Sequence, residues 1–175
     1  MTERAKIAWG LLGLVLLSIL PAISAGFVRP PGNDLLIHGP LVEGALETLR
    51  AQGWTAFQDP WFDHIGAGFP TFHHYPRLPH QLAAVLALGL GLDGLTAMAL
   101  VASVAVLLFG PAAYLGARWM GLPPPAALLA GLVAVTMQSV EPFGHTALNY
   151  GFDGHGLYGQ LVGMVFAMLA VPAWW

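Results

Sequence analysis

Apolar and polar stretches alternate along this chain at lengths that suit membrane-crossing helices. The apolar stretches cover residues 7–28, 94–118, 122–138 and 157–175. A helix of about 20 residues crosses a hydrocarbon core of about 30 Å, and each stretch reaches or approaches that length. The pattern therefore predicts an all-α integral membrane protein with about four transmembrane helices. The polar outer loops of this protein are residues 29–93 and 139–156.

The longer polar loop contains a predicted short amphipathic helix. Gly39-Pro40 is typical of a helix start, and Gly53 is typical of a helix end. Between them, apolar and charged residues are segregated at helical spacing. The apolar face has Leu41, Val42, Ala45, Leu46 and Leu49, and the solvated face has Glu43, Glu47 and Arg50. We expect this helix to lie on the membrane surface, with Trp54, Trp61 and Phe62 near the lipid headgroups.

A second segment of this loop, residues 82–92, is apolar but short. Its length corresponds to about 16 Å of helix, which does not reach across a bilayer. We interpret it as a re-entrant or interfacial helix that follows an irregular loop at Gly66–Pro79. Both polar loops then share the outer face, and Arg4, Lys6 and Arg118 share the cytoplasmic face. If the segment crosses instead, the two polar loops lie on opposite faces.

The N-terminal apolar stretch has two interpretations. Arg4 and Lys6, followed by Ala22-Ile23-Ser24-Ala25, resemble the basic region and the cleavage site of a signal peptide. The apolar run at residues 7–28 is long for a signal peptide, and further apolar stretches follow it. A retained transmembrane helix with a cytoplasmic N-terminus is therefore favoured.

The composition supports the membrane assignment and excludes several classes of function. The chain has 175 residues, of which 57% are hydrophobic and 9% charged, whereas soluble domains have about 25% charged residues. Six Lys and Arg against nine Asp and Glu give a net charge of -3, so nucleic acid is excluded as a partner. The absence of cysteine excludes disulfides, thiol catalysis and thiolate metal sites.

Ionisable residues are concentrated in the two polar loops. The interiors of the predicted spans have no Asp, Glu, Lys, Arg or His. Pumps and ion pathways use such groups at membrane depth, so the pattern disfavours them. It places the chemistry at the membrane surface, where a water-soluble group meets a lipid-borne one.

Asp34 and His38 are the first candidates for this chemistry. Asp34 is suited to act as a general base towards a hydroxyl or to hold a divalent metal. The structural alternative is an Asn-Asp turn. A zinc site is a further alternative, with ligands from Asp34, His38, His64 and His73.

The remaining histidines are more typical of donors to a backbone carbonyl, or of phosphate contacts, than of a metal site. Asp63-His64 and His73-His74 are adjacent pairs whose side chains point in different directions, which is a weak metal signature. Arg77, next to Tyr75-Pro76, is suited to bind a phosphate bidentately or to anchor the chain at the interface.

The second polar loop holds a smaller set of candidates among several glycines. These are Glu141, His145, Asn149, Asp153 and His155. Glycines let the backbone approach a ligand closely, but they are also typical of a flexible loop. Both interpretations stay open from the residues alone.

Several motifs resemble those of GT-C-type membrane glycosyltransferases. They are Asp34-xxx-His38, Gly68-Phe69-Pro70-Thr71-Phe72, Tyr75-Pro76-Arg77-Leu78-Pro79-His80, Tyr114-Leu115-Gly116-Ala117-Arg118 and Ala126-Ala127-Leu128-Leu129-Ala130. The pattern is similar to bacterial membrane proteins labelled 6-pyruvoyl-tetrahydropterin synthase-related, a label that implies no pterin chemistry. The resemblance implies a transferase that takes a sugar from a polyprenyl-phosphate carrier outside the cytoplasmic membrane.

The resemblance also implies roles for particular residues. Asp34 corresponds to the early acidic residue of these enzymes, which acts as base or metal ligand. Glu141 or Asp153 corresponds to their second acidic residue. The substrate-binding candidates are His38, His64, His73, His74, Tyr75, Arg77, His145 and His155. The second loop has no Asp-x-Asp or Asp-x-Glu pair, so the need for a divalent metal is open. Enzymes of this class have more spans, so we expect this chain to be the N-terminal part of a longer protein.

Two other functions fit the same pattern. One is a membrane scaffold or lipid-binding subunit whose loop docks a partner, for which Trp54, Trp61 and Phe62 matter more than Asp34. The other is a fragment of a transporter whose intramembrane polar groups lie in a further part of the protein.

Overall fold

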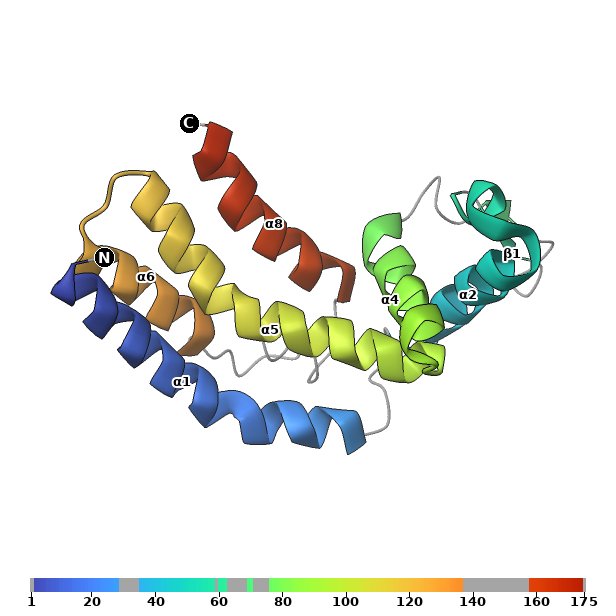
Figure 1. Ribbon diagram of the computed structural model, residues 1–175, viewed down its shortest axis with the longest axis horizontal. Helices are drawn as coiled ribbons and strands as arrows, with labels where there is room; N and C mark the ends of the chain where they lie inside the picture. Colours follow the sequence, from blue (N-terminus) through green and yellow to red (C-terminus); the bar gives the residue numbers. More distant parts are fainter. Residues whose placement is uncertain are drawn as a thin grey trace. The chain divides into compact units, whose positions relative to one another are not determined.

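The computed structural model describes residues 2–28, 35–58, 60–62, 69–70, 76–136 and 158–174. Its helices are α1 (Glu3–Val28), α2 (Leu35–Phe57), α4 (Arg77–Leu90), α5 (Gly94–Trp119), α6 (Pro124–Thr136) and α8 (Tyr158–Trp174), shown in Figure 1. Almost all of the described backbone belongs to these helices. The all-α class predicted from the sequence is therefore confirmed.

A short antiparallel strand pair interrupts the helical pattern. Strand β1 (Trp61–Phe62) pairs with β2 (Phe69–Pro70), and Trp61 lies opposite Pro70. The irregular loop predicted at Gly66–Pro79 is thus partly wrong, because it contains β2 and because α4 begins at Arg77. Two-residue strands leave little periodicity for a sequence pattern to reveal.

The chain divides into two compact units. Unit 1 combines residues 1–32 with residues 102–175, and unit 2 is residues 33–101. Unit 2 contains α2, α4 and the first residues of α5, and therefore most of the longer polar loop.

The four predicted spans all correspond to helices, but they differ in length. Among the described residues, α5 alone is long and apolar enough to cross a membrane, a result of length and composition only. Helices α6 and α8 are apolar but have 13 and 17 residues. Helix α1 begins with three charged residues, Glu3, Arg4 and Lys6.

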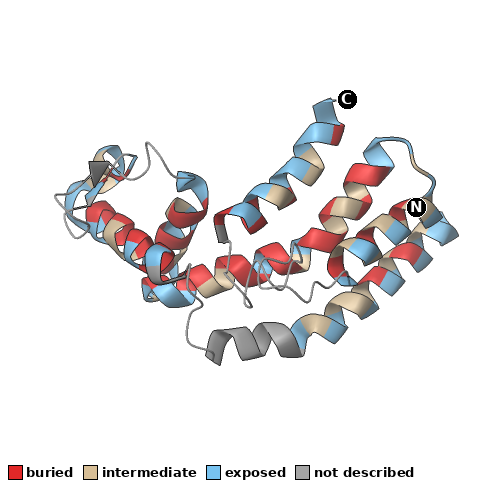
Figure 2. Ribbon diagram, turned by 180° about the vertical axis from the view of Figure 1, so that it is seen from behind, coloured by how far each residue is buried: buried red, intermediate tan, exposed pale blue. Residues whose placement is uncertain are grey.

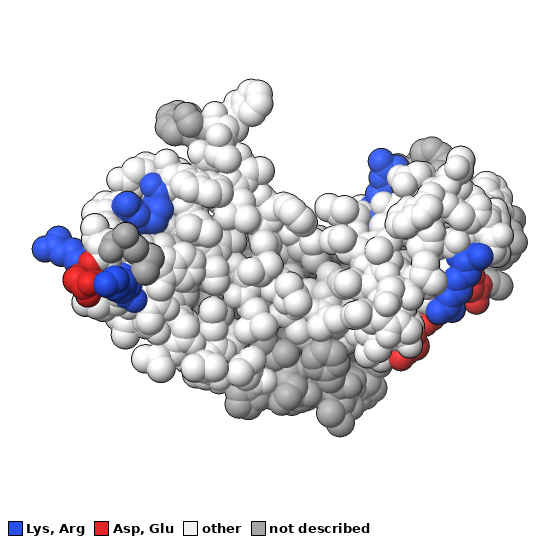
Figure 3. All heavy atoms as spheres, viewed as in Figure 1, with Lys and Arg blue, Asp and Glu red and all other residues white. Residues whose placement is uncertain are grey.

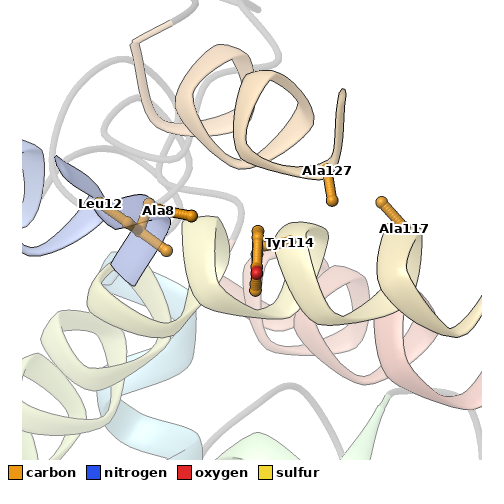
Figure 4. Packing of buried hydrophobic residues seen from close by; sticks show 5 residues of the cluster. All are labelled: Ala8, Leu12, Tyr114, Ala117 and Ala127. Carbon is orange, nitrogen blue, oxygen red and sulfur yellow. The ribbon is translucent and has the colours of Figure 1, made fainter. Parts of the chain in front are cut away.

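The core of unit 1 joins three helices through small and apolar side chains. It contains Ala8 and Leu12 of α1, Tyr114 and Ala117 of α5, and Ala127 of α6, all of them buried (Figure 4). Alanines at these positions let the helix backbones approach closely, which is how helices commonly pack within a bilayer.

Two glycines lie where α5 and α6 pack against each other. A Cβ atom on Gly110 would lie 2.5 Å from Val135 Cγ2 and 3.2 Å from the Gly131 carbonyl oxygen. A Cβ atom on Gly131 would lie 3.0 Å from the Gly110 carbonyl oxygen. An added Cβ atom on either glycine would therefore crowd the facing helix.

Unit 1 also exposes a long apolar face on α1. The exposed residues Ile7, Leu11, Leu14, Leu17 and Leu20 recur at helical spacing (Figure 2). A continuous stripe of this kind is unusual on a surface that faces water. It is what a helix needs where it faces lipid.

The described charged residues of unit 1 lie at one end of its helices. Arg118 donates a hydrogen bond to the Leu122 carbonyl, in the connection between α5 and α6. Arg4 lines a small surface pocket with Pro124 and Pro125 at the start of α6. The start of α1 therefore lies beside this connection, and Figure 3 shows charged atoms gathered at that end of α1.

Candidate functional site

Helix α2 lies in unit 2, and the face that it buries is the one predicted from the sequence. Leu41, Val42, Ala45, Leu46 and Leu49 are all buried, as expected from their spacing. The helix begins earlier than predicted, at Leu35, and includes Pro40 in its first turns. At Gly53 the backbone leaves the helical region (φ 76°, ψ -169°), a conformation that favours glycine, and helical structure resumes as far as Phe57.

Helix α4 packs against α2 with its small residues. Its buried side is formed by Pro79, His80, Ala83, Ala84 and Ala87. The helix ends at Gly91, which has a left-handed conformation (φ 67°) and whose N–H donates to the Ala87 carbonyl. The segment predicted as a short apolar helix is thus a helix that begins five residues earlier and stays too short to cross a bilayer.

The side of α4 that faces away from α2 is also apolar. Its exposed residues include Leu78, Leu82, Val85 and Leu88. The helix has no charged residue after Arg77. A helix that is apolar on both sides is typical of one that is buried in protein on one side and in lipid on the other.

A pair of buried histidines connects α2 and α4. The Nδ1 atom of His38 lies 2.8 Å from Nε2 of His80, although 42 residues separate them in sequence. Both side chains are buried, and their rings are tilted by 37° at a centroid distance of 4.9 Å. The other ring nitrogen of His80, Nδ1, lies 2.9 Å from the Pro76 carbonyl oxygen.

The hydrogen bonds assign the tautomers of this pair. A carbonyl oxygen only accepts, so Nδ1 of His80 is the nitrogen that carries a hydrogen. In the neutral ring Nε2 of His80 is then an acceptor, and Nδ1 of His38 must donate to it. The result is a directed chain from His38 through His80 to Pro76.

Burial favours the neutral form of this pair. Desolvation lowers the pKa of His80 from its usual 6.5 to about 4, with a smaller contribution from the charge of His38. The hydrogen bond to the Pro76 carbonyl acts in the opposite direction. At neutral pH, His80 is therefore uncharged.

Polar contacts also join the start of α4 to the end of α2. Gln81 Nε2 donates to the Phe57 carbonyl at 3.1 Å, and Arg77 donates to the Gln58 carbonyl at 3.4 Å. Arg77 is exposed, so its guanidinium remains accessible to solvent. The interpretation of Arg77 as a phosphate ligand stays a prediction.

The prediction that Glu43 is solvated is wrong. Its carboxylate is partly buried and accepts a hydrogen bond from the Gly94 N–H at 2.6 Å, at the start of α5. The first N–H groups of a helix have no partner within the helix, and their end of the helix favours negative charge. Helical spacing identified the outward face of α2 correctly but gave no sign that α5 begins beside it. Glu47, on the same face, is exposed as predicted.

Asp93 provides a second cap for the same helix. Its carboxylate accepts hydrogen bonds from the Thr96 N–H at 2.8 Å and from the Thr96 hydroxyl at 2.6 Å. These two bonds lower the pKa of Asp93. An aspartate immediately before an apolar run is a recognisable capping signal.

Most of the predicted site residues lie outside the described residues. His38 and Arg77 are described, and both belong to unit 2. His38 was expected in a loop, but it lies on α2 with its side chain buried. The site residues outside the described part are Asp34, His64, His73, His74, Tyr75, Glu141, His145, Asp153 and His155.

His80 was missed as a candidate because it was assigned to the loop before the apolar segment. Extending the helix back to Arg77 places His80 on the same face as Ala83, Ala84 and Ala87. Within the described residues, no group of three or more His, Asp or Glu side chains is arranged to hold a metal ion. Of the proposed zinc ligands, only His38 belongs to this part of the chain.

The chain matches no protein-family model, no curated protein and no solved structure.

Proposed function

We propose that this chain is the membrane-embedded part of a glycosyltransferase that moves a sugar from a polyprenyl-phosphate carrier to an acceptor outside the cytoplasm. The observation that carries the proposal is the organisation of unit 2. A compact helical unit holds His38 and Arg77 and continues in sequence into the long apolar helix α5. This organisation, together with the motif Asp34-xxx-His38, suits a site where a lipid-borne phosphate meets a soluble acceptor.

The exposed apolar surfaces support a multi-pass arrangement in the bilayer. The stripe on α1 from Ile7 to Leu20 and the apolar helices α5, α6 and α8 fit helices surrounded by lipid. The short helices α6 and α8 fit places where the bilayer is locally thinner. In this proposal α1, α5, α6 and α8 are the four membrane helices.

The charge distribution supports a cytoplasmic N-terminus. Arg4, Lys6 and Arg118 belong to one end of unit 1, and the positive-inside rule assigns that end to the cytoplasm. The polar loops at residues 29–93 and 139–156 then share the outer face. On that face α4 lies in the interface, with Leu78, Leu82 and Val85 towards lipid.

In this arrangement, Asp34 acts as the general base towards the acceptor hydroxyl or as a ligand of a divalent metal. Glu141 or Asp153 supplies the second acid. The exposed guanidinium of Arg77 binds the carrier phosphate, for which its planar fork is suited. His64, His73, His74, His145, His155 and Tyr75 complete the substrate site.

Substitution of Asp34 tests the proposal. The whole protein, in proteoliposomes with a radiolabelled polyprenyl-phosphate hexose, should lose transfer by roughly 100-fold or more in Asp34→Asn, because a general base contributes about that factor. Glu47→Gln is the matched control, since Glu47 is exposed on the charged face of α2. Undiminished transfer by Asp34→Asn would remove the proposed role of this residue.

One observation favours a second candidate function, a non-enzymatic lipid-binding or scaffold subunit. Trp54 is 61% exposed and Trp61 is 58% exposed, so both indoles are free to enter a headgroup layer or contact a partner. Under this alternative, Trp54→Ala and Trp61→Ala abolish the function while Asp34→Asn preserves it. The two candidates thus predict opposite sensitivities in the same set of variants.

A further inference from the structure

The small surface pocket between the starts of α1 and α6, in unit 1, combines one cation with apolar walls. The described residues that line it are Arg4, Ile7 and Ala8 of α1 and Pro124, Pro125 and Leu128 of α6. The two helices pack against each other here, with Ala8 and Ala127 in the same buried cluster. A ligand of this pocket therefore needs both a negative group and a hydrocarbon part.

The two prolines leave the start of α6 with few hydrogen-bond donors. The free N–H groups at the start of a helix commonly bind anions, but proline has no N–H group. The Ala127 N–H already donates to the Pro123 carbonyl. An anion in this pocket therefore depends on the guanidinium of Arg4, which is exposed and offers a planar fork of donors.

The charge of the surrounding surface also favours an anion. The Glu3 carboxylate pairs with the Lys6 ammonium at 2.5 Å, and both side chains are exposed. Arg118 donates to a neutral carbonyl, that of Leu122, and so keeps its positive charge. Among the described residues of unit 1, three cations against one carboxylate leave a net charge of +2 at this end (Figure 3).

The apolar walls continue into a surface that suits lipid. Ile7 lines the pocket and also begins the exposed apolar stripe of α1, in which Leu11 follows one turn later. Leu128, on the opposite wall, is partly buried against the cluster of unit 1. The pocket has a volume of about 300 Å³, the lower limit for small-molecule sites, so it holds only part of a lipid. A free phosphate ion would leave these apolar walls uncovered.

We propose that this pocket binds an anionic phospholipid of the cytoplasmic leaflet, with its phosphate on Arg4 and the start of an acyl chain between Ile7 and Leu128. Basic pockets between membrane helices on the cytoplasmic side are suited to anionic headgroups. The inference rests on the membrane placement proposed above, in which this end of unit 1 faces the cytoplasm. It adds a lipid site that is separate from the sugar-transfer site on the outer face.

Native mass spectrometry of the whole chain, released from detergent micelles with added lipid, tests the charged part of the site. We expect phosphatidylglycerol, which is anionic, to bind more tightly than zwitterionic phosphatidylcholine. Arg4→Gln should weaken phosphatidylglycerol binding roughly fivefold, the effect of one basic residue near a membrane surface. Arg50→Gln removes the same charge from an exposed position on α2 and should leave the affinity unchanged.

A second pair of variants tests the hydrocarbon part at constant charge. Ile7 is 61% exposed and lines the pocket, whereas Leu17 is 62% exposed and lies further along α1, outside it. Both positions are on the surface, so serine at either one should leave the fold intact. Ile7→Ser should weaken phosphatidylglycerol binding, and Leu17→Ser should not.

Each of three results overturns the proposal. The first is equal affinity of the natural chain for the two lipids. The second is an equal loss within either pair of variants, which indicates a general effect of charge or of apolar surface. The third is displacement of phosphatidylglycerol by excess inorganic phosphate at constant ionic strength, which indicates a site for phosphate alone. None of these measurements uses sugar transfer, so the lipid site and the proposed function fail independently.

Discussion

Glu43 Oε1 accepts a hydrogen bond from the backbone N–H of Gly94 at 2.6 Å, across 51 residues of sequence. This bond fixes the first residue of α5 to the middle of α2, within unit 2. It leaves little space around Gly94, where a Cβ atom would lie 2.6 Å from the same carboxylate oxygen. An added side chain at Gly94 would therefore displace the Glu43 carboxylate and break this bond.

Removal of the Glu43 carboxylate should loosen the start of α5. We expect Glu43→Ala to destabilise this cap by about 1 kcal/mol, because the Gly94 N–H loses its acceptor and the helix loses a favourable charge. Exchange of the Gly94 amide hydrogen should accelerate accordingly, by roughly fivefold. Mass-spectrometric hydrogen exchange over residues 93–98 measures this.

The exposed neighbour provides the control. Glu47→Ala removes the same group from the same face of α2, where the side chain is exposed, and should leave the exchange of residues 93–98 unchanged. Equal acceleration in the two variants would show that Glu43 acts through the general charge of α2 and not through the bond to Gly94.

Close packing of α5 on α6 predicts a strong effect of one added methyl group. Gly131→Ala would bring its Cβ to 3.0 Å from the Gly110 carbonyl oxygen, a backbone atom that must give way by a few tenths of an ångström. We expect a loss of about 1–3 kcal/mol in the free energy of unfolding, typical of overpacking. Thermal unfolding in detergent micelles, followed by circular dichroism, measures the change.

A glycine on α1 offers the matched comparison. A methyl group added at Gly13 would meet no atom within 4 Å, so Gly13→Ala should keep or slightly raise stability. The packing interpretation fails if Gly131→Ala is as well tolerated as Gly13→Ala.

The buried histidine pair predicts a loss of stability of unit 2 in acid. The pKa of His80 is lower in the folded chain, about 4, than its usual 6.5. The unfolded chain therefore binds the proton first as the pH falls, and stability decreases from about pH 6.5 until it levels off below about pH 4. The full loss from this group is about 3 kcal/mol.

Urea unfolding of the whole chain in micelles at several pH values between 7.5 and 3.5 measures this dependence. His80→Gln should be less stable than the natural chain at pH 7.5 and should show a smaller loss between pH 6.5 and 4. A rise in the stability of the natural chain over the same acid range would contradict the direction of the pKa shift.

Periodicity predicted those parts of the fold that depend on local spacing. The buried face of α2 from Leu41 to Leu49 was predicted because residues at i, i+3 and i+4 share a face in any helix. The helical limits of α5 followed from the same pattern, with a start at Gly94. The start of α4 was placed too late, since Pro76 and Pro79 favour a loop by local propensity.

The candidate site was less predictable because its contacts join distant residues. His38 and His80 are 42 residues apart, and no local pattern marks one as the partner of the other. The same holds for Glu43, whose direction on α2 was predicted but whose neighbour, Gly94, was not. Such pairings follow from the packing of whole helices and not from the spacing along one of them.

The proposed topology requires the polar loops at residues 29–93 and 139–156 to face the same, outer compartment. Because the chain has no cysteine, single cysteines at Gln58, Gly151 and Met120 can be labelled with a membrane-impermeant maleimide in intact cells. We expect labelling of the first two from outside, and labelling of Met120→Cys only after the membrane is permeabilised. Labelling of Gln58→Cys and Gly151→Cys from opposite sides would contradict this topology.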